Sequence, residues 1–310
     1  MKHKILQFLP DKLFVFLKNW GWQGDFSSWK EAENKSTGYS DDLILEKVKT
    51  SLLKVKCGEA VYERDSVLFD KIEYSWELLS ALMWIAAQNK GSLHVIDFGG
   101  SLGSTYYQNK IFLDSLTDVS WNIVEQPNYV KVGLESFQDD RLHFYTSIDD
   151  CYQKSKEKIN TILFSSVLQY MERPYEILES CLSLNIEFII IDRTGFTLNN
   201  KDRITLQKVP SKIYEATYPC WFFGEEKWRS FFRDNRYELI ASFDALDKVN
   251  ILSKYKGFIF RNSKSQIRNS QFQIWNSRFQ IRNSRFYLRK PGKPILTYSM
   301  MVPRRNAALL

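Results

Sequence analysis

A short apolar run, Leu93–Phe98, leads directly into a glycine-rich loop, Asp97–Gly103, and helical patterning follows from Thr105. Glycine is needed where the backbone turns sharply and where a ligand approaches without meeting a Cβ atom. The backbone N–H groups that open the following helix then face that ligand. Strand, turn and helix in this order predict the first unit of a nucleotide-binding α/β fold.

Residues 91–262 continue this alternation of short apolar runs and longer stretches with helical patterning. Such runs are typical of parallel strands that are joined by helices and buried on both faces. The expected strands are Leu93–Phe98, Trp121–Val124, Leu142–Tyr145, Thr161–Phe164 and Phe188–Ile191. Two later runs, Tyr237–Phe243 and Gly257–Phe260, are too close together for a helical crossover, so we expect an antiparallel hairpin there.

Two further segments flank this α/β region. Residues 1–90 are aromatic and helical in pattern, with helices expected after Asp41-Asp42 and over Trp76–Gln88, and they form a candidate lid. Residues 263–310 contain three near-identical units of seven residues in tandem. Because Asn-Ser recurs in every unit, a coiled coil is disfavoured, and we expect a disordered low-complexity tail.

The net charge of +7 belongs to this tail. Residues 261–310 hold 11 of the 43 basic residues and no acidic residue. The remaining residues, 1–260, therefore carry a net charge of −4, and a nucleic-acid partner is not expected.

The cysteines and the N-terminus indicate a cytoplasmic protein. The four cysteines lie far apart without a C-x-x-C pair and the chain has three histidines, so we expect reduced core thiols and no metal site. The apolar start Met1–Leu9 is interrupted by Pro10 and is too short for a signal peptide or a membrane span. Residues 13–20 are expected to pack on the body, with contact to a membrane surface as the alternative.

Two positions in the glycine-rich loop select the cofactor. The dinucleotide fingerprint G-x-G-x-x-G would need glycine at position 98, where this chain has Phe98. Asp97 would repel a pyrophosphate, whereas S-adenosylmethionine carries a sulfonium and an ammonium group and no phosphate. The loop therefore favours S-adenosylmethionine, with Asp97, Gly99, Gly100 and Gly103 as binding residues.

Acidic and polar residues also follow the next two strands, at the carboxyl ends where the ligand cleft of an open α/β sheet lies. Glu125 is expected to take the ribose hydroxyls, with Gln126 beside it. Asp149 follows the third strand and is assigned to the adenine amino group, with a helix N-cap as the alternative.

The fourth and fifth strands bring two more polar clusters to this edge. Ser165 is assigned to the cofactor, and Asp192 or Gln169 to the orientation of the acceptor, with Asp192 as the candidate base. Arg193 is assigned to an anionic group of the substrate, with Tyr170 nearby. An internal Asp192–Arg193 ion pair is the alternative interpretation.

Several motifs together resemble a little-characterised bacterial family of S-adenosylmethionine-dependent methyltransferases, whose genes often lie near surface-polysaccharide genes. The motifs are Gly21–Gly24, Tyr62–Ser66, Asp97–Gly103, Val124–Gln126, Ser165–Tyr170, Asp192–Thr194 and Tyr218-Pro219. The resemblance covers residues 20–262. It implies an α/β fold of class I, Rossmann-like, with a mostly parallel seven-stranded sheet.

The resemblance leaves the acceptor open, and a sugar or polysaccharide precursor is the expectation from the family's gene context. Glu63 and Arg64 form either a salt-bridged brace or a lid that faces the acceptor, and Tyr218 and Trp221 belong to an aromatic strip that is either core or a platform for a sugar ring. The alternative function is a non-catalytic scaffold in a polysaccharide assembly complex.

Overall fold

The computed structural model describes residues 20–37, 41–64, 66–209, 216–245, 247 and 249–263. The predictions for the first 19 residues, for Asp65 and for the repeat tail lie outside the described residues. Within them, no helix combines the length and the apolar character that crossing a membrane requires.

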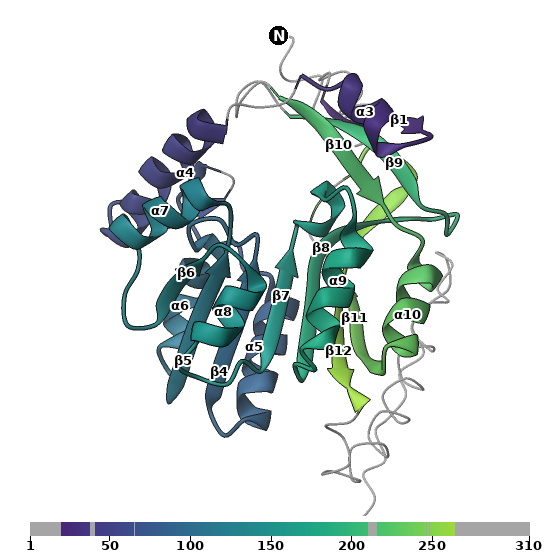
Figure 1. Ribbon diagram of the computed structural model, residues 1–310. Helices are drawn as coiled ribbons and strands as arrows, with labels where there is room; N and C mark the ends of the chain where they lie inside the picture. The colour runs from purple at the N-terminus through teal and green to yellow at the C-terminus, as the bar shows by residue number, and fades with distance from the viewer. Residues whose placement is uncertain are drawn as a thin grey trace, which may run out of the picture. The chain divides into compact units, whose positions relative to one another are not determined.

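A seven-stranded sheet forms the centre of the described structure, in the order β11-β12-β8-β7-β4-β5-β6 (Figure 1). Its strands are β4 (Ser92–Phe98), β5 (Asp118–Val124), β6 (Leu142–Tyr145), β7 (Thr161–Ser165), β8 (Phe188–Thr197), β11 (Tyr237–Asp244) and β12 (Ser253–Asn262). Strands β4 to β8 pair in parallel, and β12 pairs antiparallel with both β8 and β11. The expected parallel sheet, the expected hairpin and the class I methyltransferase fold are confirmed.

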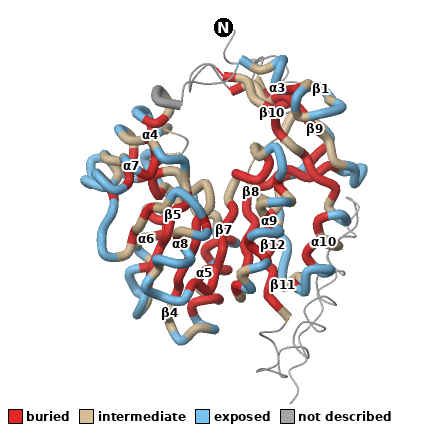
Figure 2. The backbone as a smooth tube through the Cα atoms, in the orientation of Figure 1, coloured by how far each residue is buried: buried red, intermediate tan, exposed pale blue. Residues whose placement is uncertain are grey.

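The parallel strands are apolar on both faces because helices cover both. Within β7, Leu163 belongs to one hydrophobic cluster while Ile162 and Phe164 belong to another. The first cluster packs against α4 (Asp41–Lys56), α5 (Trp76–Gln88), α6 (Ser104–Leu113) and α7 (Pro127–Ser136). The second packs against α8 (Ile148–Lys154), α9 (Pro174–Ser183) and α10 (Glu225–Asp234). The central strands are accordingly buried while the outer sides of the helices are exposed (Figure 2).

A second, three-stranded sheet was not predicted. It has the order β1-β9-β10 and consists of β1 (Gly21–Phe26), β9 (Arg203–Lys208) and β10 (Thr217–Phe222), all antiparallel. The short helix α3 (Trp29–Asn34) packs against it. A two-stranded hairpin, β2 (Tyr62–Arg64) and β3 (Val67–Phe69), was also missed. The segment before residue 90 therefore contains strands as well as the expected helices.

Two local predictions need correction. Asp41 and Asp42 are part of helix α4, so the acidic pair does not precede the helix. The thiols of Cys151, Cys181 and Cys220 are buried and free, as expected, but Cys57 is exposed and is not a core residue. Helix α5, by contrast, has the predicted bounds.

Candidate functional site

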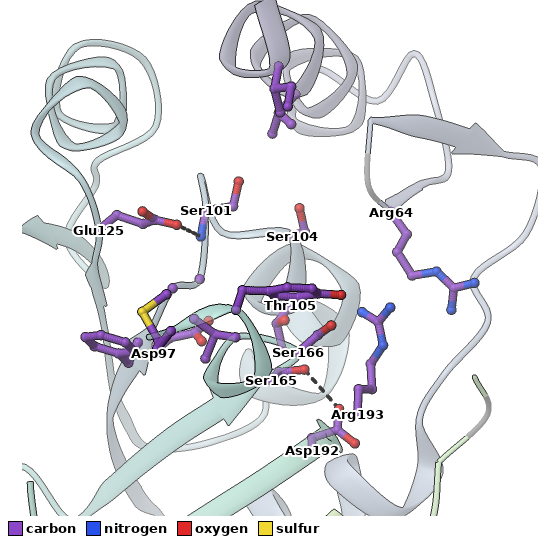
Figure 3. A pocket seen from close by; sticks show the side chains of 18 of the residues that line it. Arg64, Asp97, Ser101, Ser104, Thr105, Glu125, Ser165, Ser166, Asp192 and Arg193 are labelled. Carbon is purple, nitrogen blue, oxygen red and sulfur yellow. Dashed lines mark hydrogen bonds between the residues drawn. The ribbon is translucent and has the colours of Figure 1, made fainter. Parts of the chain in front are cut away.

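A cavity of about 1190 Å³ opens at the carboxyl ends of the parallel strands. From β4 the chain proceeds to β5 and β6 on one side, and then places β7 and β8 on the other side of β4. Open α/β sheets bind ligands at this reversal in strand order, because the loops after the two central strands diverge there. The loop after β4 and the loop after β7 both line the cavity (Figure 3).

The glycine-rich loop has a backbone that demands glycine. Gly99 has φ +70° and Gly103 has φ +106°, which residues with a side chain rarely adopt. A Cβ atom on Gly100 would lie 2.6 Å from the carboxyl carbon of Asp97. The loop thus passes close over the end of β4 and leaves the space beside it free for a ligand.

Asp97 forms the floor of the cavity at the end of β4. Its side chain is 1% exposed, and its Oδ2 accepts a hydrogen bond of 3.0 Å from Trp121 Nε1. Burial raises the pKa of Asp97 to about 7, although the Trp121 hydrogen bond lowers it in part. A cationic group at this point would find a buried partner of opposite charge.

Glu125 stands at the end of the neighbouring strand, β5. Its Oε1 accepts from the backbone N–H of Ser101 at 3.3 Å, and its Oε2 accepts from the N–H of Gln126 at 2.8 Å. The half-exposed carboxylate is thereby held beside the glycine-rich loop, as Figure 3 shows. Gln126 precedes α7 and lines the same part of the cavity.

Ser165 and Asp192 are register partners at the ends of β7 and β8. Ser165 Oγ donates to Asp192 Oδ2 at 3.0 Å, and Asp192 is 1% exposed. Asp192 Oδ1 is buried and has no hydrogen-bond partner among the described residues. Burial raises the pKa of Asp192 to about 6, and the charge of Arg193 and the bond from Ser165 limit the rise.

Arg193 forms a two-point ion pair with Asp247, a partner that the sequence did not suggest. Its Nε and Nη2 donate to the two carboxylate oxygens of Asp247 at 2.9 and 3.1 Å. Although burial opposes it, the Arg193 guanidinium holds the pKa of Asp247 below its ordinary value. In Figure 3 the side chains of Arg193 and Arg64 lie on the side of the cavity opposite Glu125.

Glu63 anchors the β2–β3 hairpin to the start of α6. Its Oε1 accepts from the N–H of Ser66 and its Oε2 from Ser104 Oγ, both at 2.6 Å. Arg64 Nη2 lies 3.9 Å from Glu73 Oε2, a loose ion pair. The hairpin that borders the cavity is therefore held in place by hydrogen bonds more than by salt bridges.

An amide and two aromatic rings line the cavity on the side of the second sheet. Gln207 Oε1 accepts from Trp22 Nε1 at 3.2 Å and from the Tyr170 hydroxyl at 2.9 Å. The rings of Tyr170 and Tyr218 meet edge to face, with centroids 5.4 Å apart. The two aromatic residues that follow Trp221 in the sequence, Phe222 and Phe223, are fully buried in the core.

Four predicted site residues do not line the cavity. Gly103 is the N-cap of α6, and a Cβ atom there would meet Leu142 in the core. Asp149 is exposed in the first turn of α8, whose N-cap is Ser147, so the N-cap alternative for Asp149 is wrong.

Gln169 and Trp221 are the other two. Gln169 is fully buried, and its Nε2 donates to the backbone oxygen of Arg193, so it stands behind the cavity wall. Trp221 Nε1 donates to the Met171 oxygen, and Trp221 lines a separate cavity of about 250 Å³. Neither residue lines the larger cavity.

Sequence reasoning missed Ser101, Gln207 and Asp247. Ser101 lies inside the recognised loop and has φ +55°, a signal that only the backbone conformation reveals. Gln207 and Asp247 come from segments without a motif. Antiparallel pairing of distant strands brings Gln207 to the site, and the β11–β12 connection brings Asp247.

His94, Asp118 and Glu157 approach one another at the other end of β4 and β5. Their ligand atoms lie within 4.8 Å, and His94 Nε2 is 3.1 Å from Asp118 Oδ2. Because the second nitrogen of a metal-bound histidine normally donates a hydrogen bond, the unpartnered Nδ1 of His94 favours a simple pair with Asp118.

No protein-family model and no curated protein matches this sequence. Among solved structures, magnesium protoporphyrin IX methyltransferase from Synechocystis PCC 6803, with bound S-adenosylmethionine, is similar with 15% identity and a TM-score of 0.40, covering 60% of this chain and 79% of that one. The 1,6-didemethyltoxoflavin-N1-methyltransferase of Burkholderia thailandensis, bound to 1,6-didemethyltoxoflavin and S-adenosylhomocysteine, has 11% identity and a TM-score of 0.38 over 73% and 91% of the chains. An S-adenosylmethionine-dependent methyltransferase of Clostridium acetobutylicum ATCC 824 has 8% identity and a TM-score of 0.41 over 61% and 92%.

Proposed function

We propose that this protein is an S-adenosylmethionine-dependent methyltransferase that methylates a hydroxyl group of a small molecule, with a sugar or polysaccharide precursor as the acceptor. The observation that carries the proposal is the placement of Asp97 and Glu125. Both carboxylates end adjacent parallel strands, flank a loop that requires glycine, and line one cavity. A non-catalytic scaffold would need neither a buried carboxylate at Asp97 nor a carboxylate at Glu125 to bind ribose hydroxyls.

The charges of this half of the cavity favour S-adenosylmethionine over a dinucleotide. The buried carboxylate of Asp97 is suited to an ammonium group and would repel a pyrophosphate. Glu125 can accept hydrogen bonds from ribose hydroxyls once its bond to Ser101 gives way. When bound, the cofactor supplies an electrophilic methyl group on a sulfonium.

We assign the base to Ser165 and Asp192, in the other half of the cavity, so Ser165 would serve the acceptor and not the cofactor to which the sequence analysis assigned it. Because Asp192 is buried and Ser165 is half-exposed, the acceptor hydroxyl would contact Ser165 Oγ first. Ser165 would take the acceptor proton while its own hydrogen passes to Asp192 Oδ2. Asp192 would keep the proton, so that the acceptor oxygen could take up the methyl group that the bound cofactor would supply. The locked positions of both residues align the acceptor, which supplies much of the rate enhancement of a displacement.

Calorimetric titration tests the cofactor. S-adenosylmethionine, S-adenosylhomocysteine and NAD are titrated into the wild-type protein and into Asp97→Ala and Glu125→Ala. We expect the two methionine-derived ligands to bind and NAD not to bind, with affinity falling at least tenfold in both variants.

Glu135→Ala is the matched control, because Glu135 is an exposed acid on α7 outside the cavity. It should bind like the wild type. If the folded wild-type protein binds neither methionine-derived ligand, the methyltransferase proposal fails and the scaffold takes its place.

A further inference from the structure

One row of side chains crosses the three-stranded sheet beside the cavity. Trp22 of β1 is the register partner of Gln207 of β9, and Gln207 is also the register partner of Tyr218 of β10. Directly opposed residues point to the same face of a sheet. The amide of Gln207 therefore stands between the Trp22 indole and the Tyr218 ring, on the face that borders the cavity.

The partners of Gln207 fix which end of its amide faces the ligand. Trp22 Nε1 carries a hydrogen and can only donate, so it requires an acceptor. Gln207 Oε1 provides that acceptor, and the same oxygen accepts from the Tyr170 hydroxyl. A flipped amide would set an N–H group against the indole N–H. The oxygen is thus committed to the protein.

The nitrogen of the same amide remains for the ligand. No hydrogen bond from Gln207 Nε2 to another described residue is present, and Gln207 is half-exposed to the cavity. Trp22 is held in turn, because Asn250 bonds both its backbone N–H, at 2.8 Å, and its backbone oxygen, at 2.9 Å. A donor held in this way selects a ligand by its acceptor atoms.

The two guanidinium groups that line the cavity among the described residues both have carboxylate partners. Arg193 is paired with Asp247 through both carboxylate oxygens, and Arg64 lies 3.9 Å from Glu73. Tyr218 and Tyr170, whose rings contact each other edge to face, contribute aromatic surface beside the amide. An uncharged ring with hydroxyl oxygens on its edge matches an aromatic face beside a neutral donor, whereas an anion would have to compete with Asp247 and Glu73 for the two guanidinium groups.

We infer that Gln207 is the residue that determines acceptor specificity: its amide nitrogen donates a hydrogen bond to an uncharged hydroxyl or ring oxygen of a pyranose acceptor that lies against Tyr170 and Tyr218. The inference rests on the proposed function, since it places the acceptor in the half of the cavity that faces Ser165.

The test uses the full-length protein saturated with S-adenosylhomocysteine. The side-chain amide resonances of Gln207 are assigned by ¹H–¹⁵N NMR from their loss in Gln207→Met. The probes are methyl α-D-glucopyranoside, methyl α-D-galactopyranoside and methyl α-L-rhamnopyranoside, with methyl α-D-glucopyranosiduronate, a glucuronate glycoside with a free carboxylate, as the anionic arm and phenol as the planar arm. We expect a saturable shift of the Gln207 amide with at least one uncharged pyranoside and none with the other two arms.

Gln207→Glu removes the hydrogen-bond donor while keeping the contacts that hold the side chain in place. The introduced carboxylate still accepts from Trp22 and Tyr170 but has no N–H to give, so pyranoside affinity should fall at least tenfold while affinity for S-adenosylhomocysteine stays unchanged. Binding should recover in part when the pH is lowered and the introduced carboxyl gains a proton. Gln23→Glu is the control, because Gln23 is exposed on the neighbouring position of β1 and points to the other face.

The results distinguish failure of the inference about Gln207 from failure of the proposed function. If the protein binds S-adenosylhomocysteine but no uncharged pyranoside moves the Gln207 amide, or if Gln207→Glu binds pyranoside like the wild type, the inference is wrong. If the glucuronate or phenol arm binds instead, the acceptor class is wrong. If S-adenosylhomocysteine itself does not bind, the proposed function has failed before the inference is reached. Should Gln207→Glu not fold, the wild-type titration alone still decides.

Discussion

At the scale of single residues, Asp97 is buried at a position where ionisation of its side chain lowers the stability of the folded protein. Burial raises the pKa of Asp97 to about 7 from its ordinary value near 3.8. A carboxyl group with a raised folded-state pKa imposes no penalty below its unfolded pKa, and the penalty grows as the pH rises towards the folded pKa. At neutral pH this side chain therefore lowers stability, which is typical of a residue kept for binding.

Asp97→Asn should stabilise the protein and remove cofactor binding together. The amide keeps an acceptor for Trp121 but carries no charge. The free energy of unfolding should rise by on the order of 2–4 kcal/mol at about pH 8 and change little at about pH 4. Chemical denaturation at both pH values measures the first effect and calorimetry the second. An equal gain at both pH values would contradict the burial argument.

The Ser165–Asp192 pair predicts a pH-dependent rate. Burial raises the pKa of Asp192 to about 6, and only the ionised form takes a proton, so kcat/KM should rise with pH and level off above an apparent pKa of about 6. Asp192→Asn should lose this limb and lower kcat by roughly 10²–10⁴-fold. Ser165→Ala should lower kcat with little change in cofactor affinity. These rates are measured on the acceptor that a product screen identifies, and an unchanged kcat in Asp192→Asn places the base elsewhere.

At the scale of elements, the left-handed backbone of Gly103 forms the N-cap of α6. Its φ of +106° would strain a residue with a side chain, and methyl groups of Leu142 and Ile123 would lie only 3.3 and 3.4 Å from a Cβ atom. Gly103→Ala should lower the free energy of unfolding by roughly 1–3 kcal/mol, measured by denaturation. Gly58→Ala is the matched control, because Gly58 also has a positive φ, of +76°, but nothing lies within 4 Å of its Cβ position. If both variants lose the same amount, core contact at Gly103 plays no part.

The strands of the central sheet could be predicted because strands that are buried on both faces consist of nearly continuous apolar residues. Leu142–Tyr145 matches the prediction residue for residue, and the last strand extends well beyond Gly257–Phe260 because hydrogen bonding continues past the apolar core. β1 contains two glycines, and β10 contains Pro219. Proline is tolerated there because β10 is an edge strand, yet it hides the strand from pattern reading.

The site could be predicted only where it follows the ends of parallel strands. Asp97, Glu125, Ser165 and Asp192 meet because a parallel sheet gathers its carboxyl ends at one edge. Gln169 also follows a parallel strand, but the turn after β7 directs its side chain into the protein and away from the cavity. Gln207 could not be found, since its place depends on pairing with a strand almost at the other end of the described chain.

At the scale of the whole molecule, the repeat tail should be dispensable for the site. Every described lining residue of the cavity precedes residue 256, and the last strand of the sheet ends at Asn262. A chain that ends after Ser263 should keep the thermal unfolding midpoint and the affinity for S-adenosylmethionine of the full chain. Differential scanning calorimetry and titration check this. A loss of affinity in a folded truncated protein would assign the tail a role in binding.

The pairing of β1 with β9 has a consequence for synthesis on the ribosome. Trp22 and Gln207 are 185 positions apart, so at about 5–20 residues per second the first strand emerges roughly 10–40 s before its partner exists. During this interval Trp22 has neither the hydrogen-bond acceptor nor the neighbouring strand that bury it in the finished protein. The wall that carries Gln207 is therefore completed only late in translation, and a nascent chain cannot recognise an acceptor before then.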